Sequence, residues 1–373
     1  MNAKEATENV GAIVSDKFHY NAGAFVSSSL VRLGSHGRAN FVGLVHDAGD
    51  EVMSYLKGGA GSYCNWESVG DLTKILSSRK ITHVLTDDYL PRMKAAAKAC
   101  HRTGIPYLVY AHIPYGFGAI SRLAHHCSSN REKGLEFAAA LVPFKALTRT
   151  YVELLLGAQR ILPNSGFTQA LLAWVYGVVS GPIAYPAVER DFLAPPPSNV
   201  AIKPNTFAIY FGNSGELTRQ DLKAVGQYCT DQGFDSGTGF GDYKTAETFK
   251  DYFSGKVVLF KEPLTSQQIV RLLSTASITI APQKYELFGL VGPESILCGT
   301  PVALANYQPW LELTGRGKFC SYIGDTHPAS AEMTDLAEIQ VELDRAQATL
   351  KKVLSPEALA STIVSAVLPP KVR

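Results

Sequence analysis

The sequence has little of several features that would assign it at once to a special class of protein. Its six cysteines include no Cys-x-x-Cys pair, so neither a disulfide framework nor a thiolate metal motif is indicated. The segment MNAKEATENVGAIVS lacks the apolar run of a signal peptide, and no stretch approaches 18 uninterrupted apolar residues. We therefore expect a soluble, cytoplasmic protein, and leave open a peripheral contact with the cytoplasmic membrane surface.

The chain also has no marked excess of charge. Its 35 lysines and arginines against 33 aspartates and glutamates leave a net charge of +2, whereas a dedicated nucleic-acid binder normally carries a strong basic excess. Hydrophobic residues make up 46% of the chain, which is enough to bury a core and excludes a disordered protein. At 373 residues the chain is too long for one ordinary domain and suits two.

Short apolar runs alternate with segments of helical period along most of the chain. In the first half, Ile81–Thr86 and Ile105–Ala111 are expected strands, and the helix Leu90–His101 between them stops at Gly104. A second series of the same kind begins at Phe207–Phe211. This alternation predicts parallel sheets with crossover helices, an α/β fold with two Rossmann-like domains.

A proline-rich stretch separates the two series. Residues Tyr185–Asn205 include the run APPPSNVAIKPN and show no helical period, so we interpret them as an interdomain linker. The expected domains are residues 1–190 and 191–354. A final helix within residues 355–373 is expected to cross back to the N-terminal domain.

The stretch Ile278–Leu304 carries the clearest chemical signal. A strand of the buried type ends at Ala281, a loop with Glu286 follows, and Glu294 opens a helix. This order places two carboxylates at the carboxyl-terminal edge of a parallel sheet, where open α/β sheets bind ligands. Gly289 in the same loop allows the backbone to approach a ligand closely.

Two kinds of chemistry meet in this loop. The N–H groups of Phe288, Gly289 and Leu290 stand just ahead of a helix and can hold a phosphate with help from the helix dipole. An ionised carboxylate only accepts hydrogen bonds, so Glu286 and Glu294 suit sugar or ribose hydroxyls and repel phosphate. Together these groups describe a site for a nucleotide sugar.

The same stretch resembles glycosyltransferase family 4, whose hallmark is two glutamates separated by seven residues within a longer frame. Glu286 and Glu294 have this spacing. Around them stand, in the order typical of the family, Pro282, Tyr285, Phe288-Gly289-Leu290 and Cys298-Gly299-Thr300-Pro301-Val302. The whole frame is far more specific than the bare spacing, and the resemblance extends more faintly over most of the chain.

The resemblance implies the GT-B fold, with residues 1–190 binding the acceptor and residues 191–354 binding the donor. It implies a retaining, metal-independent transfer of a sugar from a nucleotide sugar, with UDP- or GDP-sugars expected as donors and no further cofactor. The acceptor is expected to be a glycan, a lipid or a small molecule. Glu286 is the expected catalytic glutamate, and Glu294 is an expected donor ligand.

Other positions match the family in part. Arg219 stands near the lysine that contacts the donor diphosphate, but Asn213 stands where an arginine is expected, so one cation is missing. Gly23 is what remains of a Gly-Gly loop against the donor phosphate, and Leu264 stands where the nucleotide base is received. His112 ends a strand and is expected to bind a donor-sugar hydroxyl or to move the acceptor proton.

Plainer interpretations stay open at several of these positions. Glu294 fits a simple helix start, and Arg219 fits a solvated first turn. The helix around Arg149 fits either a membrane-surface or acceptor-binding helix or a covered crossover helix. His125, His126 and Cys127 have no partner ligand at a suitable spacing, so no metal site is expected.

Two alternatives also remain for the protein as a whole. One is a GT-B sugar-nucleotide epimerase, against which the framed glutamate pair speaks. The other is a degenerate, non-catalytic sugar- or nucleotide-binding protein. Asn213 in place of the arginine favours this second alternative, whereas the presence of both Glu286 and Glu294 opposes it.

Overall fold

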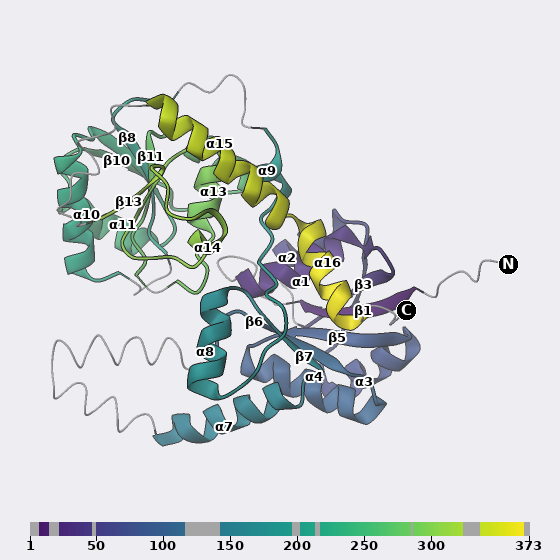
Figure 1. Cartoon of the computed structure of the whole chain (residues 1–373). Coiled ribbons are helices and arrows are strands. Elements are labelled where there is room, and N and C mark those ends of the chain that lie inside the picture. Colours follow the sequence, from purple (N-terminus) through teal and green to yellow (C-terminus); the bar gives the residue numbers. More distant parts are fainter. Residues whose placement is uncertain are drawn as a thin grey trace. The chain divides into compact units, whose positions relative to one another are not determined.

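The computed structural model describes residues 7–14, 22–46, 50–115, 142–195, 202–212, 217–284, 286–323 and 336–368. The chain divides into two compact units. Unit 1 comprises Met1–Ala187 and Pro356–Arg373, and unit 2 comprises Val188–Ser355. Each unit is built on its own parallel sheet with helices packed on it (Figure 1).

The sheet of unit 1 has the order β2-β3-β1-β5-β6-β7, with β4 paired to β3. All its pairings are parallel except the short hairpin of β2 with β3. The first strand, β1, lies in the middle of the sheet, between β3 and β5. The chain adds β3 and β4 on one side of β1 and then adds β5, β6 and β7 on the other side. The strands are β1 (Glu8–Val14), β2 (Ser35–His36), β3 (Ala39–Val45), β4 (Ser62–Asn65), β5 (Ile81–Asp87), β6 (Tyr107–Ala111) and β7 (Arg160–Pro163).

Two helical layers cover this sheet, because alternate residues of a strand face opposite sides. In β6, Val109 packs with the layer formed by α3, α4, α7 and α8, whereas Leu108 and Tyr110 pack with α1 and α16. The helices of unit 1 are α1 (Ala22–Leu33), α2 (Asp50–Lys57), α3 (Val69–Ser78), α4 (Leu90–Thr103), α7 (Val142–Leu156), α8 (Gly166–Tyr176) and α16 (Pro356–Val367).

The last helix, α16, is part of the core of unit 1 although it follows unit 2 in the sequence. Leu359, Ala360 and Ile363 are fully buried in the cluster that also holds Val26 and Leu30 of α1. Figure 1 shows α16, in yellow, beside α1. The apolar residues of α16 recur three and four positions apart, which places them on one face of the helix.

The sheet of unit 2 has the order β10-β9-β8-β11-β12-β13 and is parallel throughout. This is the order typical of dinucleotide-binding folds, in which the chain reverses direction between the first and fourth strands. Here the reversal lies between β8 and β11. The strands are β8 (Thr206–Tyr210), β9 (Ser236–Phe240), β10 (Lys256–Leu259), β11 (Ile278–Ala281), β12 (Val302–Leu304) and β13 (Cys320–Tyr322).

Aromatic rings fill one side of this sheet. Phe207 and Phe211 pack against Phe249, and their rings lie over Gly237 and Gly239 of the neighbouring strand, where any Cβ would clash. The glycines of β9 are therefore needed for packing. The helices of unit 2 are α9 (Arg190–Leu193), α10 (Arg219–Asp231), α11 (Tyr243–Phe249), α12 (Ser266–Thr275), α13 (Val291–Leu297), α14 (Leu311–Thr314) and α15 (Leu336–Val353).

The alternation of strands and helices that the sequence predicts is confirmed, but the stretch interpreted as a linker is structured in part. It contains the short helix α9, whose Phe192 is buried. The Ser266 hydroxyl of α12 donates a hydrogen bond of 2.5 Å to the Asp191 carboxylate of α9. A four-residue helix has too few residues to show a period, so the sequence pattern could not reveal it.

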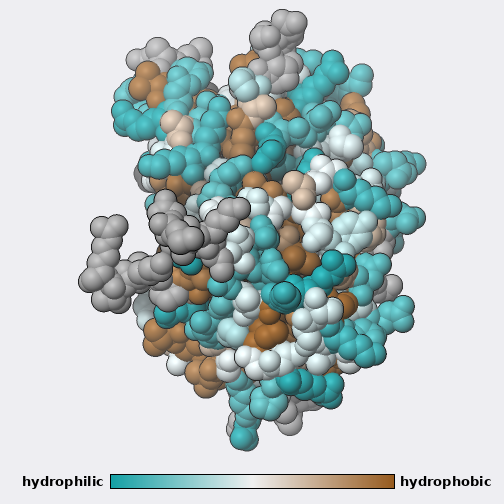
Figure 2. Space-filling view, turned by 90° about the vertical axis from the view of Figure 1, so that its right-hand side faces the viewer, coloured by the Kyte–Doolittle hydropathy of each residue, from teal (hydrophilic) through white to brown (hydrophobic). Residues whose placement is uncertain are grey.

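Among the residues that the structure describes, no helix is both long enough and apolar enough to cross a membrane. The face drawn in Figure 2 carries mainly hydrophilic residues, and hydrophobic ones form small separate areas.

The packing of α16 predicts that unit 1 depends on it for stability. Replacing Ile363 by alanine should leave a cavity against α1 and lower the free energy of unfolding of unit 1 by about 2–4 kcal/mol. The matched control is Ser365→Ala on the exposed side of the same helix, which should change little. Urea unfolding, followed through amide hydrogen exchange of β1 and β5, measures this. Equal effects of the two substitutions would contradict the packing.

Candidate functional site

The reversal of the chain in unit 2 brings two loops together at the carboxyl-terminal edge of the sheet. One loop follows β8 and leads to α10, and the other follows β11 and leads to α13. β8 and β11 are paired neighbours whose connections run in opposite directions, and ligands of open α/β sheets bind beyond the carboxyl ends of the strands at such a reversal. The predicted glutamate frame begins in the second loop, and it continues through α13 to the start of β12.

The loop after β11 is tied to the strands on both sides of it. The side chain of Gln283 is buried, and its Nε2 donates a hydrogen bond of 2.8 Å to the Tyr210 carbonyl at the end of β8. On the other side, Asn306 Nδ2, after β12, donates a hydrogen bond of 3.3 Å to the Lys284 carbonyl. The loop is therefore positioned by hydrogen bonds to its own sheet.

A buried tryptophan determines the backbone course of the rest of this loop. Trp310 is fully buried, and its Nε1 donates a hydrogen bond of 2.9 Å to Oε1 of buried Gln308. A Cβ at Gly292 would lie 2.5 Å from Trp310 Nε1, and one at Gly289 would lie 2.5 Å from Gln308 Oε1. Gly289 also has a φ of +81°, which other residues rarely adopt. Both positions therefore require glycine.

The structure reveals a cation that the sequence argument did not single out. Lys284, in the loop after β11, forms an ion pair with Asp221 of α10. Asp221 also completes a capping box, in which its carboxylate accepts a 2.8 Å hydrogen bond from the Thr218 N–H. Burial opposes ionisation of Asp221, but hydrogen bonds from Lys284 and Thr218 outweigh it and hold its pKa below the ordinary value. Only the pairing of β8 with β11 brings these residues together.

Glu294 lies in the first turn of α13 and has an unusual ionisation. Part of its surface is exposed, but protein atoms surround its carboxyl. This burial, and then the charge of Glu189, raise the pKa of Glu294 to about 8. The expectation that Glu294 is ionised is wrong for the free protein, because a carboxyl with this pKa is mostly protonated at pH 7. A protonated carboxyl both donates and accepts hydrogen bonds.

The other predicted residues of unit 2 lie around the same edge of the sheet. Glu286 is partly exposed in the loop, whereas the ring of Phe288 is buried, so Phe288 has only its backbone to offer a ligand. Leu290 is the N-cap residue of α13. Arg219 is exposed at the first position of α10, and Leu264 is partly buried after β10.

The corresponding edge of unit 1 holds His112, which follows β6. The Asn164 amide nitrogen, after β7, lies 3.0 Å from His112 Nδ1. Its oxygen accepts a hydrogen bond of 2.6 Å from Thr168 Oγ1, which orients the amide so that its nitrogen faces the ring. Burial lowers the pKa of His112 to about 4, so the ring is neutral at pH 7. With Nδ1 accepting from Asn164, the ring hydrogen is on Nε2.

A buried carboxyl that the sequence argument missed lies at the same edge. Asp88, directly after β5, is buried, and its carboxyl accepts backbone hydrogen bonds from His112 and Ile113. Burial, and then the charge of Asp87, raise its pKa to about 7. Asp87 itself is paired with Arg92, whose nitrogens lie 2.6 to 3.1 Å from its oxygens. The sequence signal that could have revealed this site is the pair of consecutive aspartates, Asp87 and Asp88, at the end of a buried strand.

The structure gives little or no information on the remaining predicted positions. Gly23 lies in the first turn of α1. Asn213 lies outside the described residues, as do His125, His126 and Cys127. Within the described residues, no group of three or more histidine, cysteine, aspartate or glutamate side chains is arranged to hold a metal ion.

Comparisons with known proteins identify similar folds and no similar sequences. No protein-family model and no curated protein sequence matches the chain. A glycosyltransferase from Rickettsia africae ESF-5 is similar with a TM-score of 0.66 and 14% identity, covering 98% of this chain and 100% of its own.

Two further similar structures are complexes with a nucleotide or a nucleotide sugar. Anabaena Alr3699/HepE in complex with UDP has a TM-score of 0.66 and 13% identity, over 97% of this chain and 99% of its own. The UDP-GlcNAc 2-epimerase from Neisseria meningitidis bound to UDP-GlcNAc has a TM-score of 0.57 and 13% identity, over 97% of this chain and 100% of its own. At such identities the similarity shows the fold. The chain has the GT-B fold of two Rossmann-like domains, and the predicted fold class is confirmed.

The ionisation of Asp88 predicts how stability depends on pH. Its pKa is about 7 in the folded protein and 3.8 as an ordinary carboxyl, so the folded state binds the extra proton between these values. The contribution of Asp88 to stability is thus full below pH 4 and is lost as the pH rises to 7. Asp88→Asn should remove this loss, and its stability relative to the wild type should rise by at most about 4 kcal/mol between pH 4 and 8.

Urea unfolding of unit 1 at several pH values measures this change. The matched control is Asp50→Asn, which replaces an exposed aspartate of the same unit. The assigned ionisation of Asp88 would be wrong if the curves of the wild type and Asp88→Asn ran parallel over the whole pH range.

Proposed function

We propose that the protein is a glycosyltransferase that moves a sugar from a nucleotide-sugar donor to an acceptor hydroxyl. The observation that carries this proposal is the loop between β11 and α13. This loop holds Glu286, and the first turn of α13 holds Glu294 at the spacing of the resembled family, at the reversal point of the sheet. The ligands named for HepE and for the epimerase, UDP and UDP-GlcNAc, support a nucleotide sugar as the donor.

Unit 2 binds the donor in this proposal. Arg219 and the backbone of residues 288–290 contact the diphosphate, and Lys284 supplies the cation that Asn213 does not. A lysine held by one carboxylate keeps further ammonium hydrogens for a phosphate oxygen. Glu294 binds the ribose hydroxyls, since a protonated carboxyl does not repel the nearby diphosphate. Leu264 packs against the base.

In this proposal unit 1 binds the acceptor. Its residue Gly23 is assigned to the donor phosphate. The neutral His112 presents the Nε2 hydrogen to an oxygen of the donor sugar or of the acceptor. Neutral His112 and the Asp88 carboxyl, whose pKa of about 7 leaves it in part protonated, suit a hydroxyl-rich acceptor, which is a glycan, a lipid headgroup or a small molecule.

The reaction breaks the bond between the anomeric carbon and the diphosphate oxygen, which keeps the electron pair. The acceptor oxygen forms the new bond to that carbon and gives its proton to the departing diphosphate. Lys284, Arg219 and the loop N–H groups stabilise the charge that develops on the leaving group. Retention of configuration, without a metal ion, follows from the family resemblance and belongs to the proposal.

Nucleotide binding tests the donor site. In calorimetric titrations with UDP, GDP and ADP, one nucleotide should bind saturably to the full chain. Lys284→Met should weaken this binding at least about tenfold, because it removes a charge-assisted contact worth about 1.5–3 kcal/mol. The matched control is Lys250→Met, at an exposed lysine after α11, which should bind like the wild type.

Removing Lys284 also leaves Asp221 buried without its ion pair, which by itself destabilises unit 2. The double variant Lys284→Met/Asp221→Asn separates the two effects, because the asparagine needs no cation. It should fold as stably as the wild type and still bind the nucleotide weakly. Wild-type affinity in this folded double variant would show that Lys284 does not contact the phosphates.

A substitution of Glu286, the proposed catalytic glutamate, tests the catalytic step. Glu286→Gln should keep nucleotide binding within about threefold of the wild type while transfer or hydrolysis of the bound donor falls at least about a hundredfold. NMR of the sugar product follows the reaction. A product with an altered ring configuration and no acceptor would indicate an epimerase. Binding without turnover, alike in the wild type and Glu286→Gln, would indicate a degenerate binding protein.

A further inference from the structure

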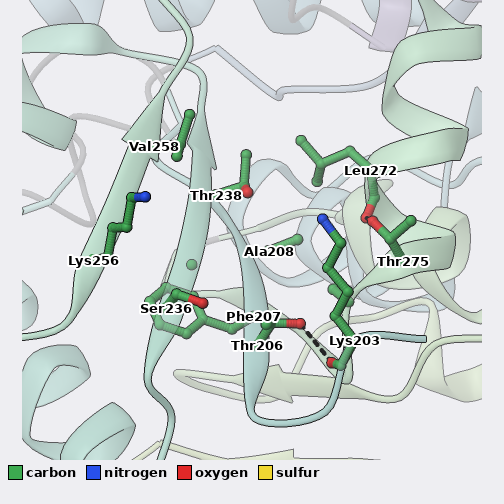
Figure 3. Close-up of a pocket in the computed structure, with 12 residues that line it drawn as sticks. Lys203, Thr206, Phe207, Ala208, Ser236, Thr238, Lys256, Val258, Leu272 and Thr275 are labelled. Carbon is green, nitrogen blue, oxygen red and sulfur yellow. Dashed lines mark hydrogen bonds between the residues drawn. The ribbon is translucent and has the colours of Figure 1, made fainter. Parts of the chain in front are cut away.

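A pocket lies in unit 2, over a part of the sheet that is separate from the proposed donor site. It has a volume of about 200 Å³ and lies over β8, β9 and β10. The strand register lines up two rows of its residues. Thr206, Ser236 and Lys256 form the first row, at the amino-terminal ends of the strands, and Ala208, Thr238 and Val258 form the second (Figure 3).

The hollow results from how α12 crosses the sheet. Leu272, Thr275 and Ala276, at the carboxyl-terminal end of α12, form the wall opposite β9 and β10. The side chains of Ser236 and Thr238 are too short to fill the space between this wall and the edge strand. Val258 on β10 keeps 49% of its surface exposed, so the pocket is open to solvent at that side.

The charged groups of the pocket all have the same sign. Lys203 and Lys256 both line it, and none of its twelve lining residues is acidic. Within the part of the chain that the structure describes, neither ammonium group has an ion pair, and the hydroxyls of Ser236 and Thr238 have no hydrogen-bond partner. Ala208, Val258 and Leu272 supply apolar surface beside these groups.

The placement of Lys203 is the informative feature. A lysine on an edge strand, such as Lys256, is also explained as protection against pairing with another sheet. Lys203 is not on a strand. Its N–H donates a hydrogen bond of 2.9 Å to the Thr275 carbonyl, and its carbonyl accepts one of 2.7 Å from Ser277 Oγ. With its backbone held in this way, its side chain extends over the sheet between Leu272 and Thr238 (Figure 3).

From these observations we infer that the pocket binds the phosphate group of a small phosphate monoester. Two ammonium groups match the charge of such a group, which is close to −2 at neutral pH. The hydroxyls of Ser236 and Thr238 can donate to its oxygens, and the apolar wall accommodates a short organic substituent. The volume is below the roughly 300–1,000 Å³ of pockets for drug-sized ligands, so the ligand is small.

This site differs from the proposed donor site in its place on the sheet. The donor site uses the loops after the carboxyl-terminal ends of β8 and β11, whereas this pocket lies over the amino-terminal and middle parts of β8, β9 and β10. The inference does not rest on the glycosyltransferase proposal, and either one can fail alone.

Calorimetric titration of the full chain with phenyl phosphate, in the presence of saturating UDP, tests the site. One molecule should bind per chain, and phenol should not bind. The double variant Lys203→Met/Lys256→Met should weaken binding at least about tenfold, because it removes two charge-assisted contacts. The control Lys250→Met/Lys352→Met, at two exposed lysines of unit 2 outside the pocket, should bind like the wild type.

A measurement on the unaltered protein tests the same site without relying on the folding of the variants. Phenyl phosphate should protect Lys203 and Lys256 from acetylation, measured by mass spectrometry, and should leave Lys250 and Lys352 equally reactive. Absence of saturable binding, competition by UDP, or equal reactivity of all four lysines with and without phenyl phosphate would overturn the inference.

Discussion

The burial of one indole ring determines the arrangement on which the proposed donor site depends. Trp310 lies against Gly292 at the start of α13, and its hydrogen bond holds Gln308 against Gly289. The backbone of the segment that joins Glu286 to Glu294 is thus packed closely against these side chains at two points, Gly289 and Gly292. A framework that is rigid before the ligand arrives reduces the entropy that binding must overcome.

The charges at the two sheet edges differ from those expected of free side chains. Low solvent access keeps Glu294 largely uncharged near neutral pH, leaves Asp88 in part protonated, and keeps His112 neutral. Lys284 remains a cation, held by an ionised Asp221. Each edge therefore carries neutral or partly protonated hydrogen-bonding groups, and the edge of unit 2 also carries a cation.

The two sheets of the chain follow the same plan. If the β2 hairpin is set aside, the strands of unit 1 have the same relative order as those of unit 2, with the reversal between β1 and β5 in place of β8 and β11. Asp88 follows β5, as Lys284 follows β11, so each unit carries a functional candidate after its fourth strand. The pocket of Lys203 and Lys256 lies away from these edges, where the crossing of α12 leaves β9 and β10 less covered.

The sequence by itself determined the alternation of strands and helices and the glutamate frame, because these depend on residues close together in the chain. Tertiary structure decided the rest. Lys284 meets Asp221 sixty-three positions away only because β8 pairs with β11, and Asp88 approaches His112 only through the neighbouring β5 and β6. The protonation of Glu294 depends on burial by residues from several elements, and no local pattern in a sequence records solvent access of that kind.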